Sequence, residues 1–318
     1  MNRNIRKLQA DKAHSTELSL VPAYTTSCGR AYVADALELL RKLPADSVSL
    51  VMTSPPFALR RKKAYGNVAP DQYVEWFLPF AQEIHRILRP DGSFVMELGG
   101  AWNSGSGTRS LYQYELILRL TRFFYLAQDF YWYNPSRLPT PAEWVTIRRT
   151  RVKDAVNTLW WLSKTTDPQA DNRRVLRPYS GSMRRLLRDG YKAAKRPSQH
   201  DISRHFRRDN GGAIPPNLLT FPNTRSRDDY LQRCRQAGLP IHPARFPPEV
   251  PDFFIRFLTE PAQLVLDPFA GSNVTGQVAE ALDRRWLSIE INADYVAGSM
   301  LRFPTAVGSP PPADSAAA

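Results

Sequence analysis

Two short motifs in this sequence combine residue types that could hold and activate a small polar group. The first, Thr53-Ser54-Pro55-Pro56-Phe57, directly follows an apolar run at 47–52. Its two prolines restrict the backbone, so that a backbone carbonyl and the Ser54 hydroxyl can face one polar group, while Phe57 offers a ring for stacking a base. One such polar group is the amino group of an aromatic ring, which is a poor nucleophile because its lone pair is delocalised into the ring. Hydrogen-bond acceptors that face its protons favour a tetrahedral nitrogen, and a tetrahedral nitrogen can attack the methyl group of a sulfonium. The alternative interpretation is a proline-rich loop with a buried phenylalanine.

The second motif is the run 267–276, Asp-Pro-Phe-Ala-Gly-Ser-Asn-Val-Thr-Gly, between a predicted strand and a predicted helix. Small residues there let the backbone approach a ligand at the carboxyl end of the strand. Glu290 ends the next predicted strand and could accept hydrogen bonds from both hydroxyls of a ribose. The glycine spacing is not that of the dinucleotide fingerprint, which argues against a nicotinamide enzyme. A tight turn that only joins strand to helix is the alternative.

The elements that would position these motifs follow an alternating strand and helix pattern. We predict strands at 47–52, 93–98, 123–133, 156–163, 264–266 and 286–289, and helices at 73–88 (with Asp71 as a cap and residues 90–92 as the stop), 110–122, 252–258 and 274–282. This alternation is typical of an open, largely parallel α/β sheet. Because both motifs follow strands, one parallel sheet would bring them to the same edge.

Between about 166 and 240 the pattern weakens and arginines become frequent, which predicts a separate basic lobe that interrupts the sheet without ending it. The residues after Phe303 are rich in Pro, Ala and Ser and are expected to be disordered. The predicted divisions are a flexible basic arm at 1–17, one half of the sheet domain at 18–165, the basic lobe at 166–240, the other half at 241–303 and a disordered tail at 304–318.

Composition narrows the class of protein and of partner. The chain has 318 residues, is 42% hydrophobic, and carries 43 basic against 30 acidic residues, a formal charge of +13. This excess suggests a polyanionic partner, with nucleic acid first. Cys28 and Cys234 lack metal-ligand spacing with the five histidines, so we expect no metal and inert thiols. No apolar stretch of membrane-spanning length and no signal peptide occur, which predicts a cytoplasmic protein.

Ser-Pro-Pro-Phe at 54–57 together with Asp-Pro-Phe-Ala-Gly-Ser at 267–272 resembles the amino-methylating DNA methyltransferases, in the arrangement where the catalytic motif precedes the cofactor motif. Within that family the resemblance to the cytosine-N4 enzymes of type II restriction-modification systems extends over nearly all of 20–303, with supporting stretches at 130–135, 151–164, 210–219 and 242–247. It implies a Rossmann-like α/β fold with a twisted, mostly parallel seven-stranded sheet and a smaller target-recognition lobe.

The resemblance also implies function and site residues. S-adenosylmethionine would be the only cofactor, double-stranded DNA the substrate, and the enzyme would be a monomer that protects host DNA from a partner endonuclease without binding it; the nearest resemblance suggests the palindrome CAGCTG. The catalytic residues would be Ser54, Pro55, Pro56 and Phe57. The cofactor site would be formed by Asp35 at the adenine end, Glu290 at the ribose, Arg245, Phe246 and Pro247 at the methionine side, and Asp267, Phe269, Gly271 and Ser272.

Ser54 favours cytosine, because in this family an Asp or Asn at that position usually goes with adenine. Methylation at ring carbon 5 needs a thiolate in a Pro-Cys context, which neither Cys28 nor Cys234 has. Glu97 departs from the expected pattern, since the nearest resemblance would place a shorter aspartate there. We interpret Glu97 as an auxiliary base that hydrogen-bonds Ser54, with a strand-end carboxylate satisfied by solvent or an arginine as the alternative.

Basic residues supply candidate DNA contacts. Arg60, Arg61, Lys62 and Lys63 follow the catalytic motif and could hold phosphates beside a flipped nucleotide, or they could form a solvated loop. In the basic lobe His200, Arg204 and Arg207 are of types that read base edges or contact phosphates. Three other functions stay open: an adenine-N6 methyltransferase, an RNA methyltransferase, and a non-catalytic DNA-binding protein that has kept the fold.

Overall fold

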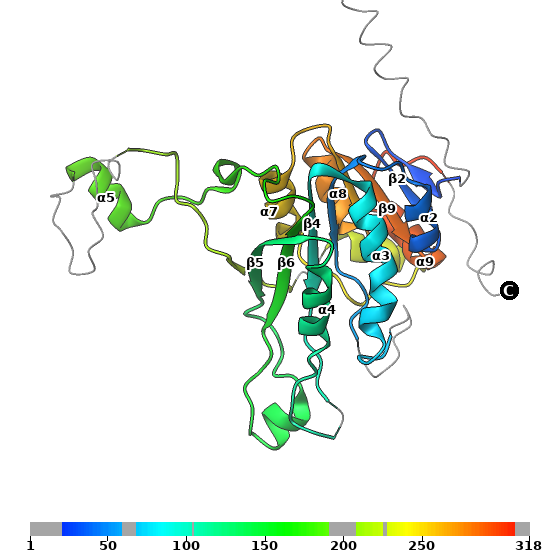
Figure 1. Cartoon of the computed structure of the whole chain (residues 1–318), viewed down its shortest axis with the longest axis horizontal. Coiled ribbons are helices and arrows are strands. Elements are labelled where there is room, and N and C mark those ends of the chain that lie inside the picture. The colour runs from blue at the N-terminus through cyan, green and yellow to red at the C-terminus, as the bar shows by residue number, and fades with distance from the viewer. Residues whose placement is uncertain (1–20, 59–67, 104, 191–207, 225–227, 309–318) are drawn as a thin grey trace, which may run out of the picture.

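The computed structural model describes residues 21–58, 68–103, 105–190, 208–224 and 228–308, which form one nine-stranded sheet with helices on both faces (Figure 1). The strands are β1 (Tyr24–Thr25), β2 (Gly29–Val33), β3 (Val48–Thr53), β4 (Leu88–Leu98), β5 (Tyr125–Tyr133), β6 (Val156–Ser163), β7 (Leu218–Thr220), β8 (Leu264–Asp267) and β9 (Arg285–Glu290). The helices are α2 (Ala36–Lys42), α3 (Tyr73–Ile87), α4 (Tyr112–Leu120), α5 (Gly181–Asp189), α6 (Asp229–Gln236), α7 (Glu249–Leu258), α8 (Val274–Ala281) and α9 (Ala293–Met300), with a π-helical turn η1 (Glu143–Ile147) and a 3-10 turn η2 (Asn172–Val175).

The strand order is β1-β2-β9-β8-β3-β4-β6-β5-β7. Strands β2, β9, β8, β3 and β4 are parallel, whereas β6 is antiparallel to both β4 and β5. The predicted largely parallel α/β sheet is confirmed. In the described residues the sheet has nine strands and not the seven that the resemblance implies, because the short strands β1 and β7 each extend one edge of the sheet. Strands β8 and β9 follow the segment 166–240 in the sequence but lie between β2 and β3 in the sheet. The segment 166–240 therefore interrupts the sheet domain in the sequence without ending it, as predicted.

Both faces of the sheet centre are covered, which explains why β3 is buried at every residue. Val51 packs in the cluster that faces α2, α3 and α4, whereas Leu50 and Met52 pack in the cluster that faces α7, α8 and α9. Strands covered on both sides need successive apolar residues in place of alternation. Each such side chain contributes about 1.5–3 kcal/mol by leaving water.

The boundary between α3 and β4 differs from the predicted one. The N-cap of α3 is Gln72 without a side-chain cap hydrogen bond, so Asp71 is not the cap. The helix ends at Ile87 and β4 begins at once, so residues 90–92 lie within the strand and not in a loop before it. The pairing with β3 shifts register there, and such a bulge tolerates a proline that cannot donate a ladder hydrogen bond.

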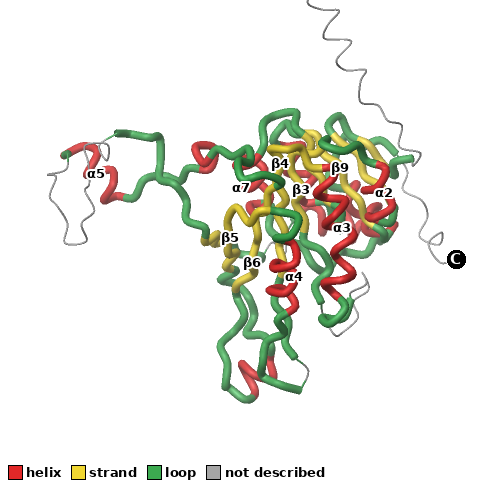
Figure 2. The backbone as a smooth tube through the Cα atoms, in the orientation of Figure 1, coloured by secondary structure: helices red, strands yellow, loops and turns green. Residues whose placement is uncertain are grey.

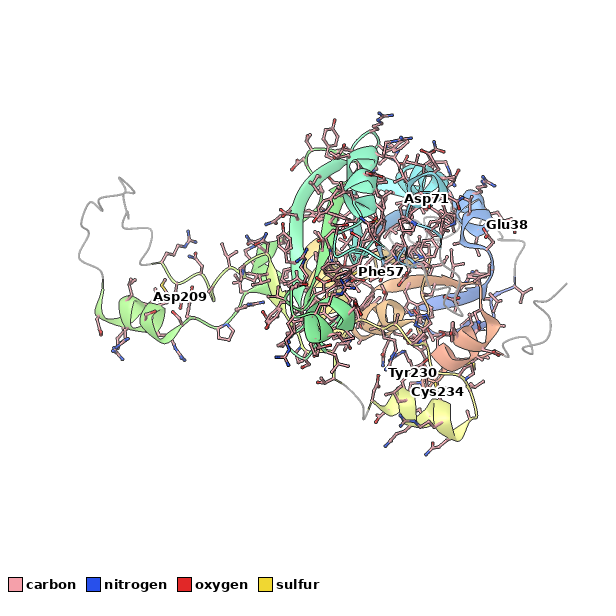
Figure 3. The ribbon with its side chains drawn as sticks, turned by 90° about the horizontal axis from the view of Figure 1, so that it is seen from below. Glu38, Phe57, Asp71, Asp209, Tyr230 and Cys234 are labelled. Atoms are coloured by element: carbon pink, nitrogen blue, oxygen red, sulfur yellow. The ribbon has the colours of Figure 1, made fainter. Side chains whose placement is uncertain are left out.

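The segment 166–240, predicted as a separate lobe, divides in the structure. Its α5 belongs to an arm that extends away from the sheet and whose described residues are mostly loop (Figures 1 and 2), whereas η2 lies against α7, with Val175 packed on the same core cluster as Phe254. Likewise, β7 pairs with β5, and α6 packs against the sheet domain through Tyr230, Leu231 and Cys234, two of which are labelled in Figure 3. The sequence did not assign β7 or α6 to the sheet domain, because these short segments contain too few apolar residues to show a periodic pattern.

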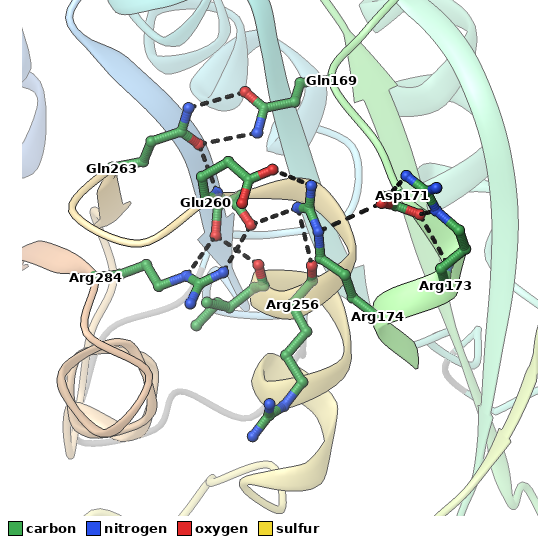
Figure 4. A network of polar contacts seen from close by, with 10 residues as sticks. Gln169, Asp171, Arg173, Arg174, Arg256, Glu260, Gln263 and Arg284 are labelled. Atoms are coloured by element: carbon green, nitrogen blue, oxygen red, sulfur yellow. Dashed lines mark hydrogen bonds and ion pairs between the residues drawn. The ribbon is translucent and has the colours of Figure 1, made fainter. Parts of the chain in front are cut away.

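Polar contacts fix the start of the arm to the domain (Figure 4). The guanidinium of Arg174 donates to the carbonyl of Thr259 at 2.8 Å and pairs with Glu260. Gln169 and Gln263 exchange amide hydrogen bonds of 3.2 and 2.9 Å. The residues that lead into the arm, at 169–174, are therefore fixed to the sheet domain by several hydrogen bonds.

The chain is ordered beyond the predicted end of the domain. Residues 304–308 are described, and Val307 exchanges two backbone hydrogen bonds of 2.9 Å with Thr25. The prediction of disorder from 304 is therefore wrong for these five residues, because β1 offers an edge with which they can pair. Residues 309–318 and the predicted arm at 1–17 lie outside the described residues.

Candidate functional site

The two predicted motifs meet at the carboxyl edge of the sheet. Thr53, the last residue of β3, donates from Oγ1 to Oδ1 of Asp267, the last residue of β8, at 2.6 Å. These residues are 214 positions apart in the sequence. The prediction that parallel strands bring both motifs to one edge is confirmed.

A cavity of about 620 Å³ lies between the motifs, within the range of roughly 300–1,000 Å³ common for small-ligand sites. Predicted site residues that line it are Ser54, Pro55, Pro56, Phe57, Glu97, Asp35, Arg245, Phe246, Asp267, Phe269, Gly271, Ser272 and Glu290. Pro247 does not line it and instead borders a neighbouring cavity beside α6, α7 and α8. Apart from Pro247, the predicted catalytic and cofactor residues therefore surround one space.

Ser54 and Glu97 are hydrogen-bonded across two neighbouring strands. Ser54, one residue beyond β3, donates from Oγ to Oε2 of Glu97 in β4 at 2.5 Å. The other oxygen of Glu97, Oε1, accepts a hydrogen bond of 2.5 Å from Nδ2 of Asn157 in β6. Each carboxylate oxygen thus has its own donor, and the carboxylate is held between the catalytic motif and the antiparallel part of the sheet.

Burial raises the pKa of Glu97, while the hydrogen bonds from Ser54 and Asn157 and the charge of Arg137 lower it. Glu97 is only 3% exposed, so its charged form has lost most of its solvation. Arg137 lines the same cavity. A carboxylate with a raised pKa and an ordered proton donor beside it is suited to accept a proton.

Phe57, which is labelled in Figure 3, lines the cavity together with Ser54. Its ring lies against Gly99, where a Cβ would come within 2.5 Å of the ring. Gly99 therefore permits a close approach that no larger residue would allow. Trp132 lines the cavity on another side and is buried.

Asp267 has its carboxylate oxygens occupied by the protein. Oδ1 accepts from Thr53 and from the backbone N–H of Phe269, and Oδ2 accepts from Thr275 at 2.7 Å. Burial raises the pKa of Asp267 to about 6 against the effect of these donors. Asp267 thus joins β3, β8 and α8 at the cavity rim.

The loop after β8 is shaped by two residues with left-handed backbone. Gly271 has φ +51°, and Asn273 has φ +54° and caps α8 by accepting from the backbone N–H of Gly276. Arg302, which follows α9, donates to the carbonyl of Ser272 at 2.6 Å. The loop is therefore fixed from the far end of the sequence, a contact that no local pattern indicated.

Glu290 closes this loop from β9. Its Oε2 accepts from the backbone N–H of Gly271 and its Oε1 from that of Asn292, both at 2.9 Å. Burial raises the pKa of Glu290. A carboxylate can accept about four hydrogen bonds, so acceptor capacity toward the cavity remains. Asp35 lies nearby as the N-cap of α2, where it accepts from the N–H of Glu38.

The remaining walls are aromatic and imidazole side chains. Phe269 packs against Trp76 and Phe80 of α3, with ring centroids 5.9 and 5.2 Å apart. His242 packs edge-on against Tyr295 and lies within 3.0 Å of the position that a Cβ on Gly271 would take. Burial lowers the pKa of His242 to about 4, so its ring is neutral at neutral pH.

The cavity suits a flat ring with a ribose and a charged end, because it combines the aromatic wall at Phe269 with buried acceptors at Glu290 and a cation at Arg245. Arg245 lies 3.7 Å from Asp228. Within the described part of the chain, no group of three or more His, Cys, Asp or Glu side chains could hold a metal ion. No helix in that part is long and apolar enough to cross a membrane.

Sequence reasoning did not assign Asn157, Arg137, His242 or Arg302 to the site. The predicted DNA-contacting residues Arg60, Arg61, Lys62, Lys63, His200, Arg204 and Arg207 lie outside the described residues. Asn157 lies within the predicted strand at 156–163, on the same face as Leu159, which pairs with Glu97, but no local pattern placed this strand beside β4. The other three come from loops and turns and have no periodic signal.

Comparison with known proteins gives consistent matches. A family model described as DNA methylase, for N6 and N4 methyltransferases, matches residues 48–301. The type II methyltransferase M.PvuII of Proteus hauseri is 54% identical over 89% of this chain and 85% of its own length. The DNA adenine methyltransferase YhdJ of Escherichia coli is 27% identical over 86% of this chain and 81% of its own.

A solved structure entitled PvuII DNA methyltransferase (cytosine-N4-specific) superposes with a TM-score of 0.74 and 48% identity, covering 90% of this chain and 89% of that one. The match of the family model at 48–301 includes both motifs and the strands β3 and β8 that carry them.

Proposed function

The chain belongs to the DNA methylase family of N6 and N4 methyltransferases, and on this premise we propose that it transfers a methyl group from S-adenosylmethionine to the exocyclic N4 of a cytosine flipped out of duplex DNA. The observation that carries the proposal is the hydrogen-bonded pair Ser54–Glu97 in the same cavity as the loop at 267–273. One part of the cavity can hold an amino group and the other a nucleoside cofactor.

Cytosine is favoured over adenine by two independent observations. Ser54 occupies the position where an Asp or Asn would go with adenine, according to the family resemblance. Identity is also higher to M.PvuII, whose solved counterpart carries the words cytosine-N4-specific, than to the adenine enzyme YhdJ, 54% against 27%. The adenine alternative therefore has less support.

The residues that would hold the cofactor are Glu290, Asp35, Phe269 and Arg245. Glu290 would accept from the ribose hydroxyls, Phe269 would cover the ring, and Arg245 would lie toward the carboxylate of the methionine part. The cofactor supplies an electrophilic methyl group on a sulfonium. The buried acids raise the affinity for a ligand rich in hydroxyl donors, and the aromatic wall excludes water from the site.

At the catalytic end, Ser54 and the backbone at Ser54-Pro55 would orient the amino group. An exocyclic amine is a weak nucleophile because its lone pair is delocalised into the ring. Ser54 Oγ can accept one amino proton while it donates its own to Glu97 Oε2, so that proton density leaves the nitrogen as its bond to the methyl forms. Glu97 is the group that finally holds the proton.

Phe57 and Trp132 would hold the flipped ring, and the prolines would keep the Ser54 backbone in one conformation. No covalent bond between enzyme and base is needed in this scheme. The protein contributes alignment and polar stabilisation of the developing positive charge on nitrogen.

Finer points of the function rest on the resemblance and are proposed with it. The recognition site is the palindrome CAGCTG, the enzyme acts as a monomer in the bacterial cytoplasm, and its modification protects host DNA from a partner endonuclease that it does not bind. The residues at 166–240 form the target-recognition lobe, of which α5 and the described residues beside it extend from the domain.

The deciding experiment is incubation of the purified protein with a CAGCTG duplex and methyl-labelled S-adenosylmethionine, followed by nucleoside digestion and mass identification. Labelled N4-methylcytosine is the expected product. Labelled N6-methyladenine would overturn the interpretation of Ser54. Cofactor binding without label in any duplex would indicate an RNA substrate or a non-catalytic protein.

A further inference from the structure

Two loops extend together beyond the catalytic edge of the sheet. They comprise residues 99–103 and 105–110 after β4, and residues 134–155 between β5 and β6, and are here called the two-loop projection (Figure 1). The carboxyl ends of β4 and β5 and the start of β6 lie at the same edge as Ser54. The projection therefore begins at the rim of the cavity, and Arg137 at its base lines that cavity.

The projection is held in one shape by a half-buried network of hydrogen bonds and an ion pair centred on Asp154. Its Oδ2 accepts from Trp102 Nε1 at 2.6 Å and pairs with Arg109 Nη1 at 2.5 Å. Arg151 Nε adds a hydrogen bond of 3.2 Å to the carbonyl of Gly107. Because these contacts join both loops, the projection can present side chains at fixed positions.

The outer surface of the projection is basic. Arg148, Arg149, Arg151 and Lys153 are all exposed, whereas the acids of residues 134–155, Glu143 and Asp154, are each paired with an arginine. Exposed aliphatic side chains accompany them, with Leu138, Ile147 and Val152 between 69% and 87% exposed. Cations beside aliphatic groups suit a nucleic-acid groove, where phosphates flank sugars and base edges.

Arg149 is the residue of this surface whose conformation and lack of partners among the described residues are most unusual. Its side chain makes no hydrogen bond or ion pair with any described residue, and its backbone has φ +54°. The left-handed conformation costs a non-glycine residue on the order of 1 kcal/mol. The chain thus presents a charged side chain at a position where glycine would be more stable.

From these observations, and resting on the proposed function, we propose that the two-loop projection is a DNA-binding element in which Arg149 contacts a backbone phosphate of the duplex that carries the flipped cytosine. The partner is duplex DNA because the projection starts at the cavity that would receive the base. It is a different element from the arm that carries α5, and Figure 1 shows the two extending in different directions.

The test is the salt dependence of binding to a CAGCTG duplex, measured by fluorescence anisotropy for the full chain. Arg149→Gly removes the charge and relieves the backbone strain, so folding is retained. We expect binding to weaken severalfold, with the slope of log Kd against log salt reduced by about one, to a similar extent on duplexes of other sequence. Arg149→Lys keeps the charge and should bind nearly as the wild type.

Two controls separate this effect from others. Arg41→Ala with Lys42→Ala removes two exposed cations from the last turn of α2, the end away from the cavity, and should leave the slope unchanged. Cofactor affinity of Arg149→Gly should equal that of the wild type, and its Tm should be equal or slightly higher because the backbone strain is relieved; if the glycine variant folds poorly, Arg149→Asn also tolerates the left-handed conformation.

An unchanged affinity and slope in Arg149→Gly would overturn the projection as a DNA-binding element while leaving the proposed function intact, provided that the wild type forms N4-methylcytosine. Weaker binding of the control pair as well would show a general charge effect and would equally overturn it. If the wild type neither binds nor methylates DNA, the proposed function fails first.

Discussion

Asn157 holds Glu97 from the side opposite to Ser54, by a hydrogen bond of 2.5 Å from its amide Nδ2 to the carboxylate Oε1. Ser54 is held by Oε2 of the same group. In the proposed scheme, the orientation of the Ser54 hydroxyl therefore depends on Asn157 of β6, which also lines the cavity. We propose that Asn157 is a positioning residue.

Asn157→Ala should lower the single-turnover rate by about tenfold without changing the cofactor Kd, because Glu97 loses one of its two donors. The pH profile should also change. Without this donor the carboxylate is less stabilised, so the acid limb should move to higher pH. Thr158→Ala, next along β6 and directed to the other face, is the matched control; an equal loss in that variant would indicate damage to the strand.

Glu97→Gln should lower the single-turnover rate about 100-fold or more, since the amide cannot hold the amino proton. The amide can also accept from only one of Ser54 and Asn157, because its nitrogen is a donor. Glu97→Asp keeps the charge at shorter reach and should retain more activity than Glu97→Gln. Full single-turnover activity of Glu97→Gln would eliminate the role of base.

The wild-type rate should depend on pH through Glu97. Burial raises its pKa above the ordinary 4.5, and only the carboxylate can accept the proton. Activity should therefore fall as the pH decreases through this raised pKa, before an ordinary glutamate would titrate. Single-turnover rates with saturating cofactor and DNA measure the acid limb of the pH–rate profile. A rate that stays constant until the protein unfolds would contradict the assignment of Glu97 as the base.

Glu290→Gln should raise the cofactor Kd by about 10- to 100-fold, as expected for loss of hydrogen bonds to a charged acceptor. The rate at saturating cofactor should change little, because Glu290 lies on the cofactor side of the cavity. Isothermal titration with S-adenosylmethionine measures this directly. An unchanged Kd, with a normal Tm, would show that Glu290 serves only the backbone N–H groups of Gly271 and Asn292.

Thr53→Val should lower the free energy of unfolding by about 1–3 kcal/mol, because a buried carboxylate loses a donor. The shapes of the two side chains are similar, so packing is preserved. Thr121→Val, at an exposed position after α4, should change stability by much less. Chemical denaturation at neutral pH compares them, and equal effects would mean that the link between β3 and β8 contributes little.

The sheet was predictable from sequence wherever apolar residues form an unbroken or alternating run. The bounds of β6 were predicted as observed, at Val156–Ser163, and β3, β8 and β9 differ by one residue or so at an end. The strands β1, β2 and β7 were missed because two to five residues carry too little periodicity. The start of β4 at Leu88 was missed because a proline and a glycine normally signal a turn.

The residues of the site were predictable where they lie in motifs, and less so where they support them. Ser54, Glu97 and Glu290 belong to strand ends that the pattern identifies. Asn157 and Arg302 act across 60 and 30 positions of sequence, on Glu97 and Ser272 respectively. Such contacts are set by strand order and by the packing of α9, which no local pattern determines.

The pairing of Thr25 with Val307 places the two ends of the described chain side by side. A covalent connection between them would leave the sheet unchanged, and new ends could then be opened at an exposed turn such as that at Gly238. The resulting circular permutant would carry the cofactor loop first and the Ser-Pro-Pro-Phe motif second. The order of the motifs along the chain is thus a matter of where the polypeptide is cut, and the same active site could be built from either order.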